Sequence, residues 1–168
     1  LLPIDTFAAL GGNALIDPQI AVEDSLQTSE ALPNTFVAGR NLIFLTFAAA
    51  LAYGKGIHHL VTGVAETDYS GYPDCRQQTL EALEKTLNLG LEYPLSLHAP
   101  LMYKSKMETV VLARTLGALP ALAFSHTCYN GQSPPCGTCP ACQLRQKGFD
   151  QAGIPDPLLS GISAPKTV

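Results

Sequence analysis

Four thiols lie within one short stretch, Cys128-Tyr129-Asn130-Gly131-Gln132-Ser133-Pro134-Pro135-Cys136-Gly137-Thr138-Cys139-Pro140-Ala141-Cys142, and they follow the spacing C-x7-C-x2-C-x2-C. Two C-x2-C steps share Cys139 and put three sulfurs on one tight turn, where Gly137 gives the backbone the freedom that the turn needs. The loop that begins at Cys128 can bring the sulfur of this residue back to the other three. Four thiolates at tetrahedral spacing are the ligands of a closed structural zinc site. We therefore expect a zinc knot formed by Cys128, Cys136, Cys139 and Cys142, in which Zn²⁺ stabilises the fold.

Clustered thiols also occur in disulfides and in iron–sulfur proteins. Disulfides belong to oxidising compartments, and the printed sequence shows no signal-peptide pattern. The run C-x2-C-x2-C also opens the bacterial ferredoxin motif, but that motif continues x3-C-P, and the corresponding position here is Gln146. The spacing therefore favours zinc over both alternatives.

Composition indicates a globular protein with a real core. The chain has 168 residues, of which 46% are hydrophobic and 14% are charged. The net charge of −4 argues against a surface that neutralises many phosphates, so we expect no nucleic-acid partner. The most apolar stretch, 42–53, is shorter than the roughly 20 residues that cross a bilayer, so we expect a buried helix and no membrane span. Five cysteines, four of them in one cluster, indicate a reducing cytoplasm.

Alternating elements predict an α/β fold with a parallel sheet. We expect helices at 6–10, 42–53, around 80–87, 105–117 and 143–149, and strands at 57–64, 91–100 and 121–124. Ser105-Lys106-Met107-Glu108 has the pattern of a capping box, which marks the start of the fourth helix. Leu80, Leu83 and Leu87 form one apolar stripe, as in a helix that covers a sheet.

A polar and aromatic loop follows the first expected strand. In open α/β sheets, ligands bind beyond the carboxyl ends of the strands. Tyrosine rings can stack on a flat heterocycle, and carboxylates accept hydrogen bonds from its N–H groups. A plain turn would account for a few of these residues but not for the whole set. We expect the substrate to be bound by Asp68, Tyr69, Ser70, Tyr72, Asp74 and Arg76.

Three more polar side chains lie at expected helix starts. Arg40 and Asn41 precede the apolar helix, where backbone amides and a guanidinium can meet an anion, so we expect them to bind substrate as well. Lys106 lies in a first turn, where the helix dipole disfavours a cation unless an anion is present. We therefore expect Lys106 to bind nucleotide. The plain alternative for Arg40 and Lys106 is a solvated side chain.

Other reactive residue types receive no catalytic role. His58 and His59 lie at the start of a strand, away from the end where ligands collect, and are expected at the surface. Cys75 has no histidine beside it in the sequence, so packing or pocket lining is expected. The catalytic residues stay unassigned.

Three segments together resemble the 7-cyano-7-deazaguanine synthase family: Gly39-Arg40-Asn41-Leu42-Ile43-Phe44-Leu45, Asp68-Tyr69-Ser70-Gly71-Tyr72-Pro73-Asp74-Cys75-Arg76, and Cys128-Tyr129-Asn130-Gly131 with the later cysteines. The resemblance covers roughly residues 30–150. It implies a Rossmann-like, adenine nucleotide α-hydrolase-like fold of the ATP-pyrophosphatase group and a structural zinc. It also implies a carbon–nitrogen ligase of queuosine precursor synthesis, which converts 7-carboxy-7-deazaguanine, ammonia and ATP, with Mg²⁺, into the nitrile through an adenylated acid and an amide.

One family feature is missing from these residues. The family carries an S-G-G-x-D-S loop that holds the pyrophosphate of ATP, and Gly11-Gly12-Asn13 lacks its Ser and Asp. Because residue 1 is Leu, we expect the N-terminal part of the fold to lie outside this sequence, and we expect the 168-residue chain alone not to turn over ATP. The expected organisation is a partial α/β domain over 1–126, a zinc-binding segment over 127–150 and an extended tail over 151–168.

Two other functions stay open at this point. A non-catalytic, zinc-stabilised binding or assembly module could derive from the same fold by loss of the nucleotide loop. Another ATP-pyrophosphatase, such as a tRNA-thiolating enzyme, fits the fold but fits poorly with the acidic charge and the Tyr-rich loop. We also expect a homodimer, with the apolar helix at 42–53 as a candidate for its interface.

Overall fold

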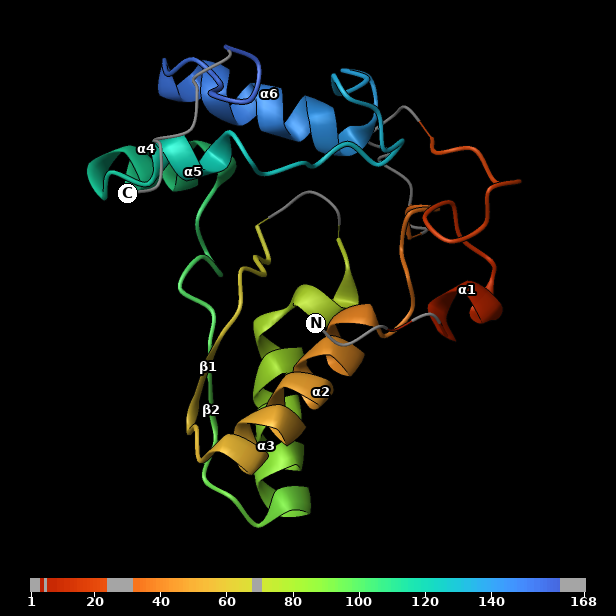
Figure 1. Cartoon of the computed structure of the whole chain (residues 1–168), viewed down its shortest axis with the longest axis vertical. Coiled ribbons are helices and arrows are strands. Elements are labelled where there is room, and N and C mark those ends of the chain that lie inside the picture. The colour runs from red at the N-terminus through yellow and green to blue at the C-terminus, as the bar shows by residue number, and fades with distance from the viewer. Residues whose placement is uncertain (1–3, 5, 24–31, 68–70, 161–168) are drawn as a thin grey trace. The chain divides into compact units, whose positions relative to one another are not determined.

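The computed structural model describes residues 4, 6–23, 32–67 and 71–160. Its elements, in chain order, are α1 (Thr6–Leu10), α2 (Arg40–Lys55), β1 (His59–Val61), η1 (Pro73–Cys75), α3 (Gln77–Leu91), β2 (Ser96–His98), α4 (Lys106–Thr115), α5 (Leu119–Leu122) and α6 (Pro140–Ala152) (Figure 1). The chain forms two compact units, Phe36–Tyr103 on the one hand and Leu1–Thr35 with Lys104–Val168 on the other.

The unit Phe36–Tyr103 is a two-stranded parallel sheet with two helices on one face. Strands β1 and β2 pair in the register His59↔Ser96, Leu60↔Leu97 and Val61↔His98. Helix α2 packs on β1, α3 packs on β2, and the two helices pack on each other (Figure 1). Leu60 and Leu97 face the helices and join their core clusters. The predicted α/β class with a parallel sheet is confirmed.

Helix α2 is bounded by two glycines in the left-handed region. Gly39 precedes it with φ 71°, and Gly56 ends it with φ 66°, a conformation that costs glycine little because it has no Cβ. Leu45, Ala49 and Ala52 face the core. The expectation that this helix is covered on nearly all faces is wrong for the described residues, because an opposite stripe of Phe44, Phe47 and Leu51 is 45–52% exposed.

Helix α3 is fastened to the strand that follows it by its own side chains. Asn88 both donates from Nδ2 to the Leu95 carbonyl at 2.9 Å and accepts from the Leu95 N–H at 2.8 Å. The Glu84 carboxylate accepts from the Leu97 N–H at 2.6 Å. These bonds satisfy backbone groups at the edge of a short sheet, where an unpaired donor or acceptor would destabilise the fold.

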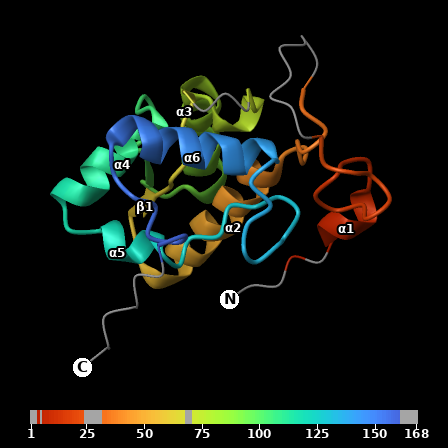
Figure 2. The same cartoon turned by 90° about the horizontal axis from the view of Figure 1, so that it is seen from above.

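The other unit is built on a close pair of helices, α4 and α6 (Figure 2). The predicted capping box of α4 is confirmed: Ser105 Oγ accepts from the Glu108 N–H at 3.2 Å, and the Glu108 carboxylate accepts from the Ser105 N–H at 2.8 Å. Gly148 of α6 is buried at the contact. A Cβ at that position would lie 2.7 Å from the Cβ of Lys106, so glycine allows the two helices to approach closely.

Three expectations about this unit and the strands require correction. Residues 121–124 do not form a strand, because α5 spans Leu119–Leu122; Pro120 in its first turn and the surrounding alanines favour helix over strand. Helix α6 is longer than the expected 143–149 because Pro140 begins it and Gly153 ends it. The expected strands 57–64 and 91–100 are only three residues long each, because only His59–Val61 and Ser96–His98 pair with each other, and residue 91 belongs to α3.

The chain after α6 is held in place rather than loose as far as residue 160. The Arg145 guanidinium binds Asp156 through Nε at 2.5 Å and through Nη2 at 2.7 Å. It also donates to the carbonyls of Ser125 and Leu122, each at 3.0 Å, and lies over the ring of Phe149. The N–H groups of Leu159 and Ser160 donate to the Asp156 carbonyl, and residues 161–168 of the predicted tail lie outside the described residues. The division into 1–126, 127–150 and 151–168 stays a prediction.

The membrane prediction can be compared with the helices directly. None of the helices in the described ranges combines the length and the apolar character that crossing a bilayer requires.

Candidate metal centre and substrate-binding segments

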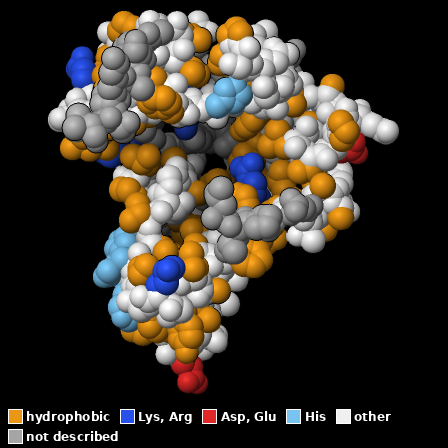
Figure 3. All heavy atoms as spheres, in the orientation of Figure 1, with side chains coloured by type: hydrophobic (Ala, Val, Ile, Leu, Met, Phe, Trp, Pro, Cys, Tyr) orange, Lys and Arg blue, Asp and Glu red, His pale blue; other side chains and the backbone are white. Residues whose placement is uncertain are grey.

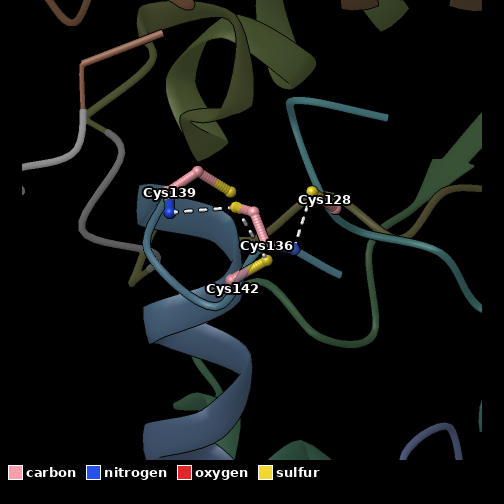
Figure 4. Close-up of side chains that lie close together, drawn as sticks. All are labelled: Cys128, Cys136, Cys139 and Cys142. Carbon is pink, nitrogen blue, oxygen red and sulfur yellow. Dashed lines mark hydrogen bonds between the residues drawn. The ribbon is translucent and has the colours of Figure 1, made fainter. Parts of the chain in front are cut away.

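The four clustered cysteines converge on one point. Their sulfurs all lie within 4.8 Å of one another, and Figure 4 shows the side chains pointing toward a common centre. Cys139 is fully buried, and Cys128 and Cys142 are nearly so. All five cysteines are free thiols, which excludes disulfides among them in this structure. The structure therefore brings together the predicted ligand set, and a metal ion could be held by these four sulfurs.

Local backbone geometry explains why the sulfurs meet. Gly131 and Gly137 have φ values of 64° and 77°, so each turn uses a conformation that a side chain would strain. Cys139 directly precedes α6, and Pro140 at its first position is pre-set for the helix. Cys142 lies in the first helical turn, where the positive end of the helix dipole favours a thiolate. The stretch thus positions three ligands by turn and helix-start chemistry alone.

Polar hydrogens surround the sulfurs. The backbone N–H groups of Tyr129, Cys136 and Cys139 donate to Cys139, Cys128 and Cys136 respectively, each at 3.4 Å. Side chains add to them: Asn130 Nδ2 lies 3.5 Å and Thr138 Oγ1 3.7 Å from the Cys136 sulfur. Such donors orient metal ligands and offset the negative charge of a tetrathiolate. Sequence reasoning missed these donors. Of the three N–H groups, that of Cys139 follows its acceptor Cys136 by three residues and could have been found from the spacing.

The thiols are not equivalent as acids. The backbone N–H groups of Cys139 and Thr138 lower the pKa of Cys136 to about 5. Desolvation by burial raises the pKa of Cys142 to about 12. Burial acts against ionisation of Cys128 too, but backbone donors led by the Cys136 N–H outweigh it and lower the pKa of that thiol. At neutral pH Cys136 is therefore ready to bind a cation, whereas a metal must displace a proton from Cys142.

A metal ion held by all four sulfurs would have a complete tetrahedral shell, with no position open for water or substrate. Among the described residues, no other group of three or more His, Cys, Asp or Glu side chains has metal-binding geometry.

The two predicted substrate-binding segments meet in the unit Phe36–Tyr103. The Asp74 carboxylate, 4% exposed, accepts from the Asn41 N–H at 3.0 Å. Asn41 Nδ2 lies 3.2 Å from the sulfur of Cys75. Asp74 therefore caps the start of α2 from another element, satisfying one of the free N–H groups of its first turn. Through this hydrogen bond Asp74 connects the predicted segment at 68–76 to the predicted segment at 40–41.

The remaining predicted residues of this region differ in exposure. Tyr72 is buried, and its ring lies 5.6 Å from that of Phe36. Arg40 is half-buried in the first turn of α2, and Arg76 is exposed before α3. Asp68, Tyr69 and Ser70 lie outside the described residues.

Glu66 was not among the predicted site residues, and the structure gives it a definite role. Its carboxylate accepts from the Gln77 N–H at 3.1 Å and so caps α3 across the loop. Thr79 Oγ1 also donates to the Pro73 carbonyl at 2.7 Å. These two bonds fix η1 relative to the helix start. An acidic residue eleven positions before a helix carries no local capping signal, so only the folded chain shows it.

Lys106 lies in the other unit, at the first position of α4. It is exposed, and its backbone and Cβ line the contact with Gly148. Its nucleotide-binding role stays a prediction.

Comparison with known proteins identifies the family. Residues 1–153 match the family model described as Queuosine biosynthesis protein QueC. The chain belongs to this family. It is 65% identical to the 7-cyano-7-deazaguanine synthase of Chromobacterium violaceum over 98% of this chain and 70% of that protein. It is 64% identical to the synthase of Laribacter hongkongensis over 97% of this chain and 71% of that protein, and 51% identical to that of Acidovorax sp. strain JS42 over 90% and 66%.

Membership agrees with the architecture described above. The QueC family has an adenine nucleotide α-hydrolase-like fold, and this chain shows its mixed α/β character, a parallel strand pair and the four-cysteine cluster. The resemblance predicted from the sequence is confirmed.

Proposed function

We propose that this chain provides the substrate-binding segments and the metal knot of a 7-cyano-7-deazaguanine synthase. The observation that carries the proposal is the 65% identity to a protein of that name over 98% of the chain, which includes both the aromatic–acidic loop and all four cysteines. The reaction is an ATP-dependent ligation that converts 7-carboxy-7-deazaguanine and ammonia into the nitrile.

The proposed reaction requires the protein to position the acid, ATP and ammonia and to neutralise charge. A carboxylate is a poor electrophile, so transfer of AMP from ATP, with release of pyrophosphate, turns one of its oxygens into a leaving group. Ammonia then displaces AMP and gives the amide. A second adenylation, on the amide oxygen, and loss of AMP with two protons give the nitrile. Positioning and charge neutralisation are the main contributions that a protein makes to such steps.

This chain's residues suit recognition of the acid. In the proposal, Tyr69 and Tyr72 stack on the deazaguanine, Asp68 accepts hydrogen bonds from its ring, and Ser70 contacts its edge. Arg40 and Arg76 neutralise carboxylate or phosphate groups, and Lys106 binds nucleotide, with Mg²⁺ accompanying ATP. Asp74 and Asn41 hold the two segments together, as their 3.0 Å hydrogen bond supports.

The knot is proposed to hold one Zn²⁺ with a structural role. The metal would fix the start of α6 to the Cys128 loop. Free thiols at this centre support a reducing compartment, and we place the protein in the cytoplasm.

We further propose a homodimer that uses the exposed stripe of α2. Phe44, Phe47 and Leu51 follow the spacing i, i+3, i+7, and the helix carries charge only at its ends, on Arg40 and Lys55. A second copy related by a two-fold axis would therefore meet apolar side chains without like-charge repulsion. Light scattering on Phe47→Ser, compared with the parent chain, tests this interface.

The function is tested by a fusion. The part of the Chromobacterium violaceum synthase that the alignment leaves uncovered is joined to this chain and assayed for nitrile from the acid, ammonia and ATP by mass spectrometry. We expect product from the fusion and none when Tyr72 is changed to Ala. A folded, zinc-loaded fusion that binds the acid without making nitrile would instead favour the non-catalytic module.

A further inference from the structure

A pair of histidines lies on the sheet face opposite the helices of the unit Phe36–Tyr103. Side chains alternate along a strand, and Leu60 and Leu97 face α2 and α3. His59 of β1 and His98 of β2 therefore point to the other face, and both are exposed. In Figure 3, histidine side chains gather at the surface beside these strands.

The two rings are held at metal-chelating distance. His59 Nδ1 lies 3.1 Å from His98 Nε2, with ring centroids 5.2 Å apart. With metal–imidazole bonds of about 2.0–2.1 Å, two nitrogens at that separation subtend an angle of about 95–102° at a shared cation. That angle lies between the octahedral and tetrahedral values, and water can complete the shell.

Among the described residues, the side chains of His59 and His98 form hydrogen bonds only with each other. The neighbouring His58 differs, because its Nδ1 lies 2.8 Å from the Pro94 carbonyl and its Nε2 lies 3.3 Å from the Tyr93 hydroxyl. Its ring also stacks on Tyr93. The chain thus offers one available pair and one engaged histidine next to it.

We propose that His59 and His98 form a cross-strand chelate for a divalent transition cation of the Ni²⁺, Cu²⁺ or Zn²⁺ class, separate from the four-cysteine centre. Imidazole is a preferred ligand for these ions. Binding replaces the ring-to-ring hydrogen bond: the donating ring moves its proton to its other nitrogen, so two neutral imidazoles bind the cation without redox change. The cation joins β1 to β2, whose ladder is only three residue pairs long, and so stabilises the strand pair.

The test uses Ni²⁺, which does not oxidise thiols, on the full chain with the cysteine centre first saturated with Zn²⁺. Calorimetric titration should show one Ni²⁺ per chain. His59→Ala and His98→Ala should each weaken binding by roughly tenfold or more, while His58→Ala stays near the parent affinity. Ni²⁺ should also raise the melting temperature of the parent and of His58→Ala, but not of His98→Ala.

Three results would contradict the proposed cation site at His59 and His98. Absence of Ni²⁺ binding to the zinc-saturated chain overturns the proposal. So does binding that survives in His98→Ala, or a loss of equal size in His58→Ala. Circular dichroism confirms that each variant is folded, and because both rings are exposed, two independent variants report on the same site.

Discussion

The contact between α4 and α6 makes a sharp prediction about Gly148. Adding a methyl group there would bring it to 2.7 Å from the Cβ of Lys106 and to 3.2 Å from the Lys106 carbonyl carbon. Neither atom is the end of a flexible side chain, so the helices themselves must move. Overpacking of this kind costs about 1–3 kcal/mol. The better helix propensity of alanine returns up to about 1 kcal/mol.

The expected net effect of Gly148→Ala is a loss of about 1–2 kcal/mol in the free energy of unfolding. For a chain of 168 residues this lowers the melting temperature by about 2–8 °C. Thermal and guanidinium unfolding of the zinc-loaded chain, followed by circular dichroism, measure both quantities.

The matched control is Gly90, the penultimate residue of α3. A Cβ built there meets nothing within 4 Å, so Gly90→Ala gains propensity without a clash. It should stabilise the chain by about 0.5–1 kcal/mol. If both variants change stability in the same direction, close helix approach does not explain the glycine in α6, and the reasoning is refuted.

Four further predictions concern the metal knot and two buried carboxylates. Cys136→Ser should abolish stoichiometric zinc by elemental analysis, whereas Cys75→Ser, the matched control, should retain it. Zinc affinity should fall as the pH falls from 7 to 4, because protons compete with the metal for all four sulfurs, and it should fall most steeply below about pH 5, where the Cys136 thiol also takes up a proton; a chromogenic chelator followed over this range measures it, and release already complete at pH 7 would contradict it. Arg145→Ala should cost about 3–5 kcal/mol in chemical denaturation because it strands the buried Asp156 charge, and the double variant with Asp156→Ala should cost less than the two single changes together. Asp74→Ala should cost about 1–2 kcal/mol through loss of the α2 cap, and Asp74→Asn, which keeps an acceptor, should cost less; equal losses would argue against the cap.

Local signals account for the parts of the fold that sequence reasoning located well. The Ser105–Glu108 capping box and the leucine stripe of α3 act within a few residues, so the sequence contains all the interactions needed to recognise them. The expected strand at 121–124 failed because a short apolar run fits a strand or a helix equally well, and Pro120 decided for the helix. The lengths of the other two strands were overestimated for a related reason: a strand extends only as far as its residues pair with a neighbouring strand, and that neighbour cannot be read from the strand's own sequence.

One part of the candidate site could be predicted from the sequence, and another part could not. The cysteine spacing named its ligands because three of them lie on one turn, and the sulfurs do meet within 4.8 Å. Residues of the loop 68–76 were predicted to bind substrate as a set. The structure gives one of them, Asp74, a capping role toward α2, and it gives Glu66, which was not in that set, a capping role toward α3. Residues 33 and 11 positions away supply those partners, and such pairings have no periodic signature.

The sequence by itself determined the family, the α/β class and the set of thiols that can hold a metal, because these follow from motifs whose members are close in the chain. Only the tertiary structure shows that the carboxylates of Asp74 and Glu66 cap helices α2 and α3. It also shows why position 148 requires glycine and that His59 lies beside His98 on the neighbouring strand. Those properties depend on contacts between distant segments, and their energies exist only once the chain has folded.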